Sequence, residues 1–333
     1  VAHCTNMQLT SPMEGRSRAI SSSEISAIPV ENLLFGVPKK GRLYDKCIKL
    51  LEGIGLEYKR PERLDVAHCT NMPITLVFLP AADIATYVGE GNVDMGITGL
   101  DVIAESVPEE EVEVVMKLGY GKCKLAVQAP VADGIRDVSY LAGKRIVTSF
   151  PTLAKRFFQK YESAATGETK IKFVSGSVEA ACGLGLADAV VDLVETGTTM
   201  RAAGLEIVQN IMETEAVLIC RPKSTHGEIL DTIKQRIQGF ITATKYQMIQ
   251  YNIAKKDLEK GVKITPGKRS ATVPGREEDG RERITAQVSS LEDSQFCSVS
   301  ALVLKDEAAR IMDELHKIGA DSILIFSLSN TRM

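Results

Sequence analysis

The 333-residue chain contains no tryptophan, and aromatic residues make up only 5% of it. It therefore lacks the aromatic platforms on which single-stranded nucleic acids stack. Its formal net charge is −3, without the basic excess of a nucleic-acid-binding protein. No apolar run reaches the roughly 18 residues that a membrane-spanning helix needs. The composition predicts a protein with neither a nucleic-acid nor a membrane partner.

Paired cysteines and metal-ligand spacings are also missing. The seven cysteines are scattered without a Cys-x-x-Cys pair, and the four histidines lie far apart in the sequence. Neither set has the spacing of a zinc site or of a disulfide framework. The amino end does not show the charged-then-apolar pattern of a secretory signal. We therefore expect reduced thiols and a cytoplasmic location.

The length of the chain predicts two or three domains, each with an ample core. The first 32 residues are polar, Ser-rich and aperiodic, and the heptapeptide at 1–7 recurs at 66–72. We expect this segment to be a disordered or artefactual tail. The expected division is a tail (1–32), a first lobe (33–118 with 206–222), a second lobe (119–205) and a C-terminal domain (223–333).

The most informative stretch runs from Glu179 to Gly204. Ala189 to Val194 is an apolar run bounded by turn formers, as in a buried parallel strand. The loop after it offers consecutive backbone N–H groups, a glycine and three hydroxyls, and such a strand–loop–helix junction binds phosphate. Its residues are Glu195, Thr196, Gly197, Thr198 and Thr199. An ordinary turn with threonine caps is the alternative.

Two carboxylates, Asp188 and Asp192, flank the same predicted strand. Acidic groups repel phosphate but accept hydrogen bonds from sugar hydroxyls. A phosphate loop beside such acceptors indicates a phosphorylated ribose. Glu179 opens the preceding helix, expected over 179–186, where it either contacts a nucleotide or belongs to a capping arrangement.

A basic segment follows the strand expected at 33–37. Lys39, Lys40, Gly41 and Arg42 lie between that strand and a helix expected at 44–54. Cations at a strand end favour an anionic ligand, although a solvated charge cluster is the alternative. Arg63 would add a further cation.

A weaker phosphate-type turn is formed by Thr98 and Gly99, between a strand through Met95 and Ile97 and a helix from Asp101. Thr98 and Gly99 are the candidates for ligand contact in this turn, whereas Asp101 reads as a helix cap.

The carboxyl-terminal third begins with a helix expected over 223–253 and continues as a small α+β sandwich. Its expected elements are strands near 262–264, 297–304 and 323–327 and a helix at 306–318. Residues 274–287 are highly charged and read as a solvated insertion.

These segments together resemble one enzyme family. The spacing of Glu179, Gly185, Asp192, Thr196-Gly197 and Thr199 is similar to the signature of the ATP phosphoribosyltransferases. The segments "PKKGRL", "GITG" and "ITPGKRSATV" resemble further parts of the long form of that family, so the resemblance covers roughly 33–333. It implies an α/β fold: a two-lobed, periplasmic-binding-protein-like catalytic part plus a small C-terminal α+β, ferredoxin- or ACT-like regulatory domain.

The resemblance also implies a reaction, the first step of histidine biosynthesis. Phosphoribose would pass from 5-phosphoribosyl 1-pyrophosphate to N1 of the adenine of ATP, with release of pyrophosphate. Mg²⁺ would be held mainly by substrate phosphates, histidine would inhibit allosterically, and the chain would form dimers or hexamers. Catalytic roles fall to Asp192, Asp188, Arg42 and Lys39, and substrate binding to Glu195, Thr196, Gly197, Thr198, Thr199, Lys40, Gly41, Arg63, Thr98, Gly99 and Glu179.

Three other functions compete with this one. A nucleobase-salvage phosphoribosyltransferase usually has two adjacent acids before its phosphate loop, whereas Asp188 and Asp192 are separated. A solute-binding module of the same two-lobed fold predicts a secretion signal and needs no phosphate loop. A catalytically silent regulatory subunit would not need the intact loop or the basic segment, and only an assay separates it from an enzyme.

Overall fold

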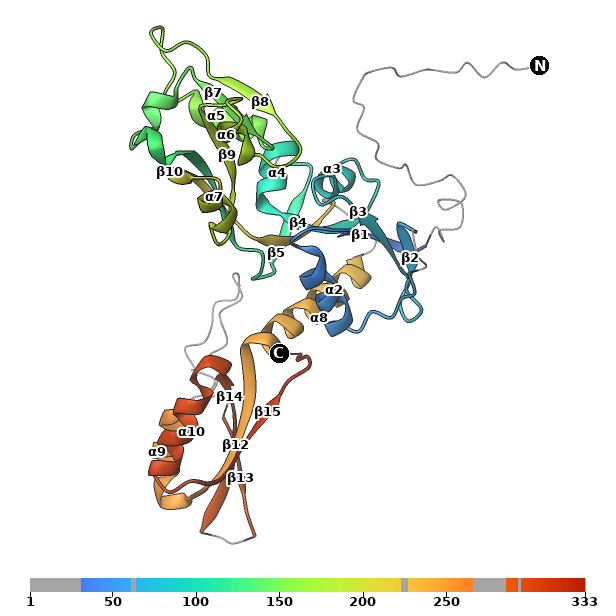
Figure 1. The fold of residues 1–333 in the computed structure, drawn as a ribbon. Helices are drawn as coiled ribbons and strands as arrows, with labels where there is room; N and C mark the ends of the chain where they lie inside the picture. The colour runs from blue at the N-terminus through green and yellow to red at the C-terminus, as the bar shows by residue number, and fades with distance from the viewer. Residues whose placement is uncertain are drawn as a thin grey trace, which may run out of the picture.

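The computed structural model describes residues 31–60, 64–108, 110–222, 227–265, 286–292 and 295–332. Within these ranges the chain forms two neighbouring α/β lobes and a C-terminal domain that extends away from them (Figure 1). The predicted tail lies outside the described residues except for its last two positions, and so does the charged segment except for residues 286 and 287.

Lobe I is built on a six-stranded sheet in the order β2-β3-β1-β4-β11-β5. β1 pairs in parallel with β3 and β4, and β11 joins antiparallel between β4 and β5. β3 is buried along its whole length, as its continuous apolar run predicts. The strands are β1 (Leu33–Pro38), β2 (Val66–His68), β3 (Ile74–Leu79), β4 (Met95–Gly99), β5 (Glu113–Lys117) and β11 (Ala216–Cys220), and the helices are α2 (Tyr44–Gly53), α3 (Ile84–Gly89) and α4 (Leu100–Ser106).

Lobe II has a five-stranded sheet in the order β10-β6-β9-β7-β8. The central strand β9 pairs in parallel with β7 and antiparallel with β6. The strands are β6 (Cys123–Pro130), β7 (Arg145–Thr148), β8 (Lys170–Phe173), β9 (Ala189–Val194) and β10 (Leu205–Thr214), and the helices are α5 (Pro151–Phe158), α6 (Ala180–Gly183) and α7 (Thr198–Ala202), with short 3-10 turns at Val131–Asp133 and Val138–Leu141.

The chain crosses between the lobes twice, from β5 to β6 and from β10 back to β11. One predicted boundary is wrong. β10 pairs along its length with β6, so residues 206–214 belong to lobe II, and only the strand at 216–220 returns to lobe I. The two-lobed α/β fold class with a small C-terminal domain is confirmed.

The C-terminal domain follows α8 (Gly227–Lys245) and differs from the prediction at two places. The predicted long helix ends at Lys245, and the next nine residues are β12 (Tyr246–Ala254). The predicted strand at 262–264 is the end of helix α9 (Leu258–Ile264). The rest of the domain is β13 (Gln287–Ser290), β14 (Phe296–Leu304), α10 (Ala308–Lys317) and β15 (Asp321–Ser327), with 3-10 turns at Lys255–Asp257 and Lys305–Glu307.

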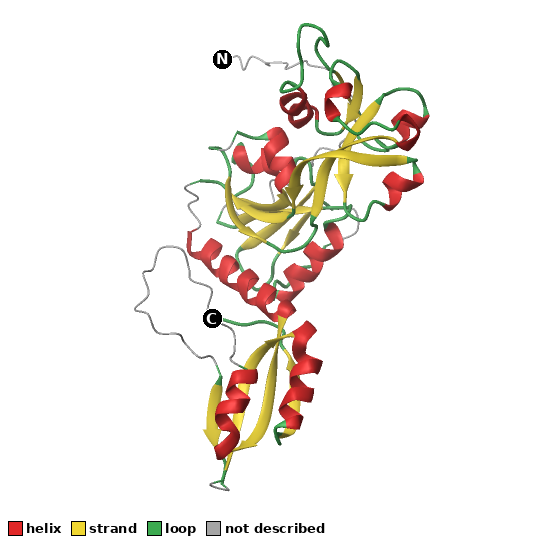
Figure 2. Ribbon diagram, turned by 90° about the vertical axis from the view of Figure 1, so that its left-hand side faces the viewer, coloured by secondary structure: helices red, strands yellow, loops and turns green. Residues whose placement is uncertain are grey.

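The sheet of this domain has the antiparallel order β13-β14-β12-β15. Together with the βαββαβ element order this is a ferredoxin-like arrangement. Figure 2 shows the two helices beside the sheet of this domain. Both belong to its core: Leu258 of α9 and Ile311 and Leu315 of α10 pack with the alternate strand residues Ile249 and Tyr251. This confirms the expected small α+β domain.

Helix α8 joins the domain to lobe I. Its buried residues Ile233 and Ile237 belong to the same core as Leu50 and Leu51 of α2. The last described residues return to this junction, where the side-chain amide of Asn330 donates to the carbonyl oxygens of Gly53 (2.9 Å) and Arg236 (3.2 Å). In the parts of the chain that the structure describes, no helix has the length and apolarity to span a bilayer.

Candidate active site between the lobes

The loop after β9 has the form that its sequence predicts. Gly197 has φ +74°, and a Cβ at this position would lie 2.6 Å from the Arg201 guanidinium. The hydroxyls of Thr196 and Thr198 are 3.0 Å apart, and the guanidinium of Arg201 donates to the Thr196 carbonyl at 3.0 Å. The glycine thus lets the loop turn sharply into α7, while the exposed Thr196, Thr198 and Thr199 keep their hydroxyls accessible.

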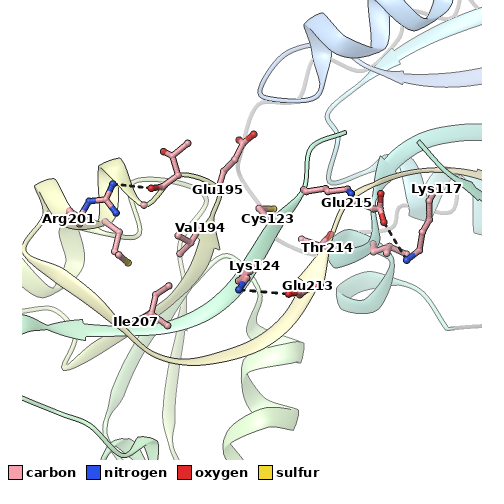
Figure 3. A pocket seen from close by; sticks show the side chains of 15 residues that line it. Lys117, Cys123, Lys124, Val194, Glu195, Arg201, Ile207, Glu213, Thr214 and Glu215 are labelled. Carbon is pink, nitrogen blue, oxygen red and sulfur yellow. Dashed lines mark hydrogen bonds and ion pairs between the residues drawn. The ribbon is translucent and has the colours of Figure 1, made fainter. Parts of the chain in front are cut away.

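A cavity of about 530 Å³ adjoins this loop at the junction of the lobes (Figure 3). Glu195, Thr196, Gly197 and Arg201 line one side of it. The other side comes from lobe I and the two crossing segments: Leu100, Lys117, Lys122, Cys123, Lys124, Glu213, Thr214 and Glu215. This volume is typical of small-molecule sites, which often lie where two domains meet.

The cations that line the cavity were not among the predicted site residues. Lys117 pairs with Glu215 at 3.4 Å and Lys124 with Glu213 at 3.8 Å, and Lys122 is exposed. Their signal in the sequence is a cluster of three lysines around the first crossing and an arginine, Arg201, two positions after the phosphate loop. Positive charge beside the loop favours an anionic ligand.

Asp192 lies on β9 just before the loop. Burial, together with a smaller effect of the negative charge of Glu179, raises the pKa of its carboxyl group to about 6, against the lowering effect of the hydrogen bond from the Leu193 backbone N–H. Glu179 makes no capping hydrogen bond to α6; it shares a hollow of about 490 Å³ with Thr199. The structure therefore brings Asp192, Glu179 and Thr199 to one region of lobe II.

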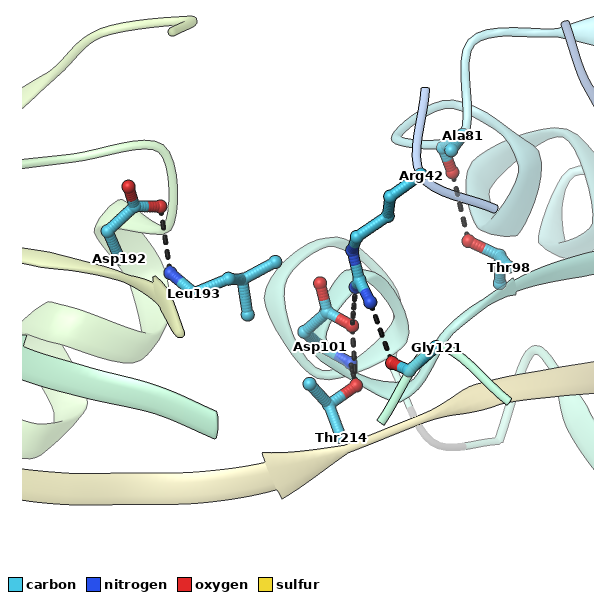
Figure 4. Close-up of polar contacts among 8 residues, drawn as sticks. All are labelled: Arg42, Ala81, Thr98, Asp101, Gly121, Asp192, Leu193 and Thr214. Carbon is cyan, nitrogen blue, oxygen red and sulfur yellow. Dashed lines mark hydrogen bonds and ion pairs between the residues drawn. The ribbon is translucent and has the colours of Figure 1, made fainter. Parts of the chain in front are cut away.

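Arg42 reaches from lobe I to the hinge. Its guanidinium donates to the Gly121 carbonyl at 2.7 Å and lies 3.8 Å from a carboxylate oxygen of Asp101. Asp101 is 2% exposed; its oxygen accepts the Thr214 hydroxyl at 2.5 Å, and its backbone N–H donates to the same hydroxyl at 3.0 Å. Figure 4 shows Arg42 and Asp192 on opposite lobes with Asp101 and Thr214 between them. Asp101 is thus a buried anchor rather than the simple helix cap that the sequence suggested.

The remaining residues of the basic segment differ in their surroundings. Lys39 forms an ion pair with Asp65 at 3.5 Å, and Lys40 is exposed. Gly41 has φ +90°, and a Cβ at this position would have no atom within 4 Å. The glycine is therefore needed for the turn and not to make room for a neighbour. The segment leaves the carboxyl end of β1, on the lobe I side of the hinge.

The structure does not bring every candidate to the cavity. Thr98 and Gly99 end strand β4 and are buried, not in a loop, and the Thr98 hydroxyl donates to the Ala81 carbonyl at 2.9 Å. Leu100 is the neighbour that lines the cavity. Arg63 lies outside the described residues.

Asp188 is at the opposite end of β9 from the loop, where its carboxylate forms a bidentate pair with Arg145, with Nη2–Oδ1 at 2.7 Å and Nε–Oδ2 at 3.2 Å. The hydrogen bonds from Arg145 hold the pKa of Asp188 below its ordinary value. Its assignment as a catalytic residue is therefore not supported by its position, because six strand residues separate it from the loop.

Comparison with known proteins decides the family. Residues 80–239 match the family model described as ATP phosphoribosyltransferase, and residues 243–330 match the model described as HisG, C-terminal domain. The chain is 47% identical over 305 residues to the ATP phosphoribosyltransferase of Yarrowia lipolytica, covering 91% of this chain and 97% of that protein. The chain belongs to the ATP phosphoribosyltransferase family.

Other relatives agree with this membership. The ATP phosphoribosyltransferase of Saccharomyces cerevisiae is 43% identical over 307 residues, covering 91% of this chain and 97% of that protein. Among solved structures, the ATP phosphoribosyl transferase (HisG:HisZ) complex from Thermotoga maritima includes a chain that aligns with a TM-score of 0.52 and 26% identity, covering 62% of this chain and 98% of its own length. The chain therefore contains both parts that the two family models describe, the ATP phosphoribosyltransferase lobes and the additional C-terminal domain.

Proposed function

We propose that the chain transfers phosphoribose from 5-phosphoribosyl 1-pyrophosphate to N1 of the adenine of ATP, releasing pyrophosphate. The observation that carries this proposal is the loop from Glu195 to Thr199, whose hydroxyls and sharp glycine turn open onto a cation-lined cavity near the half-buried Asp192. Family membership supplies the identity of the two substrates.

Lobe II would hold the sugar donor. The 5′-phosphate accepts hydrogen bonds from the backbone N–H groups of the loop and from the hydroxyls of Thr196, Thr198 and Thr199. Asp192 in its ionised form accepts hydrogen bonds from the ribose hydroxyls. Arg201, which already contacts the loop backbone, adds positive charge beside the phosphate.

Lobe I and the crossing segments would hold the polyphosphates. Lys39, Lys40 and Arg42 leave the carboxyl end of β1, and Lys117, Lys122 and Lys124 line the cavity. Leu100 takes the place of the buried Thr98 and Gly99 on the cavity wall, and Glu179 of lobe II remains an expected neighbour of the nucleotide. Cations on both lobes would neutralise two substrates that are both polyanions.

The chemistry suits a site without a strong nucleophile or base. The lone pair of adenine N1 forms a bond to the anomeric carbon while the bond from that carbon to the pyrophosphate oxygen breaks, and pyrophosphate leaves with the bonding electrons. Positive charge develops on the ribose, where a carboxylate such as Asp192 stabilises it. Catalysis then depends mainly on positioning and preorganised charge.

Mg²⁺ fits this site as a companion of the substrates. Among the described residues no three His, Cys, Asp or Glu side chains gather as a metal site. Three carboxylates line the cavity, of which Glu213 and Glu215 are paired with lysines and Glu195 forms no ion pair with another described residue. Mg²⁺ takes six oxygen ligands and is commonly held by one or two carboxylates with substrate phosphates and water. When bound, it would neutralise charge on the departing pyrophosphate.

Regulation by histidine and assembly of homo-oligomers are further proposals, and they concern the C-terminal domain. The sheet face opposite its helices exposes Leu304, Leu324 and Phe326 at 40%, 51% and 46%. Exposed apolar side chains gathered on one face favour contact with another chain. Light scattering with and without histidine tests both the oligomer and its response.

The six described cysteines are free, which suits a reducing compartment such as the cytoplasm, and cell fractionation tests that location.

The deciding experiment is a pyrophosphate-release assay with ATP, 5-phosphoribosyl 1-pyrophosphate and Mg²⁺. We expect release only when both substrates are present, and suppression of that release by histidine. Omission of each substrate in turn is the control. Absence of release from a folded, substrate-binding protein would instead assign it to the silent-subunit alternative.

A further inference from the structure

Helix α5 of lobe II lacks a cap of its own. Its N-cap residue is Phe150, which has no side-chain acceptor, and its first residue is Pro151, which has no backbone N–H. The first backbone donors of the helix are therefore those of Thr152 and Leu153. Unpaired donors at a helix start cost stability unless an acceptor is supplied from elsewhere.

That acceptor comes from the other lobe. Glu105, in the last turn of α4 in lobe I, accepts the Thr152 N–H at 2.8 Å on one carboxylate oxygen and the Leu153 N–H at 2.9 Å on the other. A carboxylate at this position is also favoured by the helix dipole. Two short charge-assisted hydrogen bonds to successive amides form one of the stronger polar contacts available to a protein.

The contact is isolated from the hinge. The other hydrogen bonds and ion pairs that join the lobes in the described ranges lie at the crossing segments, around Asp101, Thr214 and Glu215. The apolar residues of α4 and α5 belong to separate cores, and beside the two helices lies a crevice of about 670 Å³ lined by Ile103, Val107, Arg156 and Met212 among others. Glu105 is thus the polar link that fixes the distance between these two helices.

We infer that Glu105 is a positioning residue that latches the two lobes in the arrangement that binds substrate. This inference rests on the proposed function for its catalytic consequence. Lobes joined only by two crossing strands are expected to move relative to each other. α4 starts at Leu100 on the wall of the cavity, and α5 follows β7, the strand beside β9. The latch therefore sets the spacing of the lobe I wall from the phosphate loop.

The first test requires no substrate. Hydrogen exchange measured by mass spectrometry on the full chain should show faster exchange in peptides covering α4 and the start of α5 when Glu105→Ala is compared with wild type. Glu105→Gln retains one acceptor oxygen and should fall between them. The matched control is Glu110→Gln, which removes an exposed carboxylate from the same side of lobe I. An unchanged exchange pattern in Glu105→Ala would overturn the latch.

The second test separates a latch from a local helix cap. If the latched population falls to about a tenth, the apparent affinity for substrate falls about tenfold, because only that population binds. We expect KM to rise by that factor in Glu105→Ala while kcat changes less than about twofold, since saturating substrate restores the closed arrangement. Faster exchange with an unchanged KM would reduce Glu105 to a local cap.

Failure of the latch and failure of the proposed function give different results. A wild-type protein without turnover, but with faster exchange in both α4 and α5 of Glu105→Ala, would reject the reaction and retain the latch, because loss of a local cap alone would affect only α5. Normal turnover with equal KM values in the wild type, Glu105→Ala and Glu110→Gln would retain the reaction and reject the latch. A large fall in kcat at unchanged KM would place Glu105 among groups that act in the transition state, and would also reject the latch.

Discussion

The two sides of the cavity are built in different ways. On lobe II the site is one continuous segment, from Asp192 to Arg201, whose contacts lie within a few residues of each other. On lobe I and the hinge it is a network of residues far apart in the chain, since Arg42, Asp101 and Thr214 come from three elements. The local side depends on backbone conformation, and the network side depends on burial and on partners. Substitutions should therefore damage the two sides for different reasons.

The largest effect is expected from Gly197→Val in the local side. A branched side chain at φ +74° is strained, and its Cβ would collide with Arg201. We expect kcat/KM to fall at least about a hundredfold, because the loop donors move away from the phosphate. Gly204→Val is the matched control, since Gly204 has φ +71° but a Cβ at this position would have no atom within 4 Å. Equal activity losses in both variants would attribute the effect to strain alone.

Asp192→Asn tests the same side through its charge. The pKa of Asp192 is raised by burial to about 6, so the wild-type kcat/KM should rise with pH through about 6 as the ribose acceptor ionises. The asparagine variant should be less active, and its kcat/KM should not rise with pH in this range. Pyrophosphate release measured between pH 5 and 8 provides the comparison. If kcat/KM of Asp192→Asn still rises with pH through about 6, the titrating group is not Asp192.

The same substitution has a consequence for stability. Because the folded pKa of Asp192 is higher than the ordinary aspartate value of 3.8, the folded chain binds more protons than the unfolded chain between pH 4 and 6. The wild-type free energy of unfolding should therefore fall as pH rises through that window. Asp192→Asn should remove this part of the pH dependence, as denaturant titrations at several pH values would reveal.

Asp101→Ala tests the network side, with a smaller effect on turnover and a larger one on stability. It leaves the Thr214 hydroxyl and the Arg42 guanidinium without the buried carboxylate that both contact. We expect a loss of about 1–3 kcal/mol in the free energy of unfolding and a fall in kcat/KM of about tenfold as Arg42 loses its position. Asp45→Ala, at an exposed site on α2, is the control. Full activity would show that Arg42 does not need this anchor.

The difference between the two sides also explains what the sequence could predict. Strand β9, its loop and the start of α7 follow from residue types within a dozen positions, and the structure has them almost as predicted. The Asp101–Thr214 contact spans 113 positions, and no local pattern connects them. The same limit applies to Glu105, whose partners lie in the other lobe.

The errors in the fold arise where tertiary contacts override local pattern. The apolar spacing of α8 continues into residues 246–254, yet that segment lies between two neighbouring strands, and pairing with β14 and β15 makes it β12. Residues 262–264 are rich in strand formers but end helix α9, which packs closely against Tyr251 through Gly261, where a Cβ would lie 3.0 Å from the tyrosine oxygen. Both cases show propensity yielding to packing.

The smallest effect is expected from Asp188→Asn, which tests whether nearness in sequence means nearness in the site. Asp188 is four positions from Asp192, but its carboxylate pairs with Arg145 at the far end of β9. Since its folded pKa is lowered by that pair, any stability it contributes is present above its unfolded pKa and is lost as pH falls. The pair is partly exposed, with side-chain exposures of 34% and 50%, so the contribution should be small. We expect kcat and KM near wild type and a melting temperature at pH 7 within replicate scatter. A loss of turnover comparable with that of Asp192→Asn would return Asp188 to the site and show that β9 shifts when substrate binds.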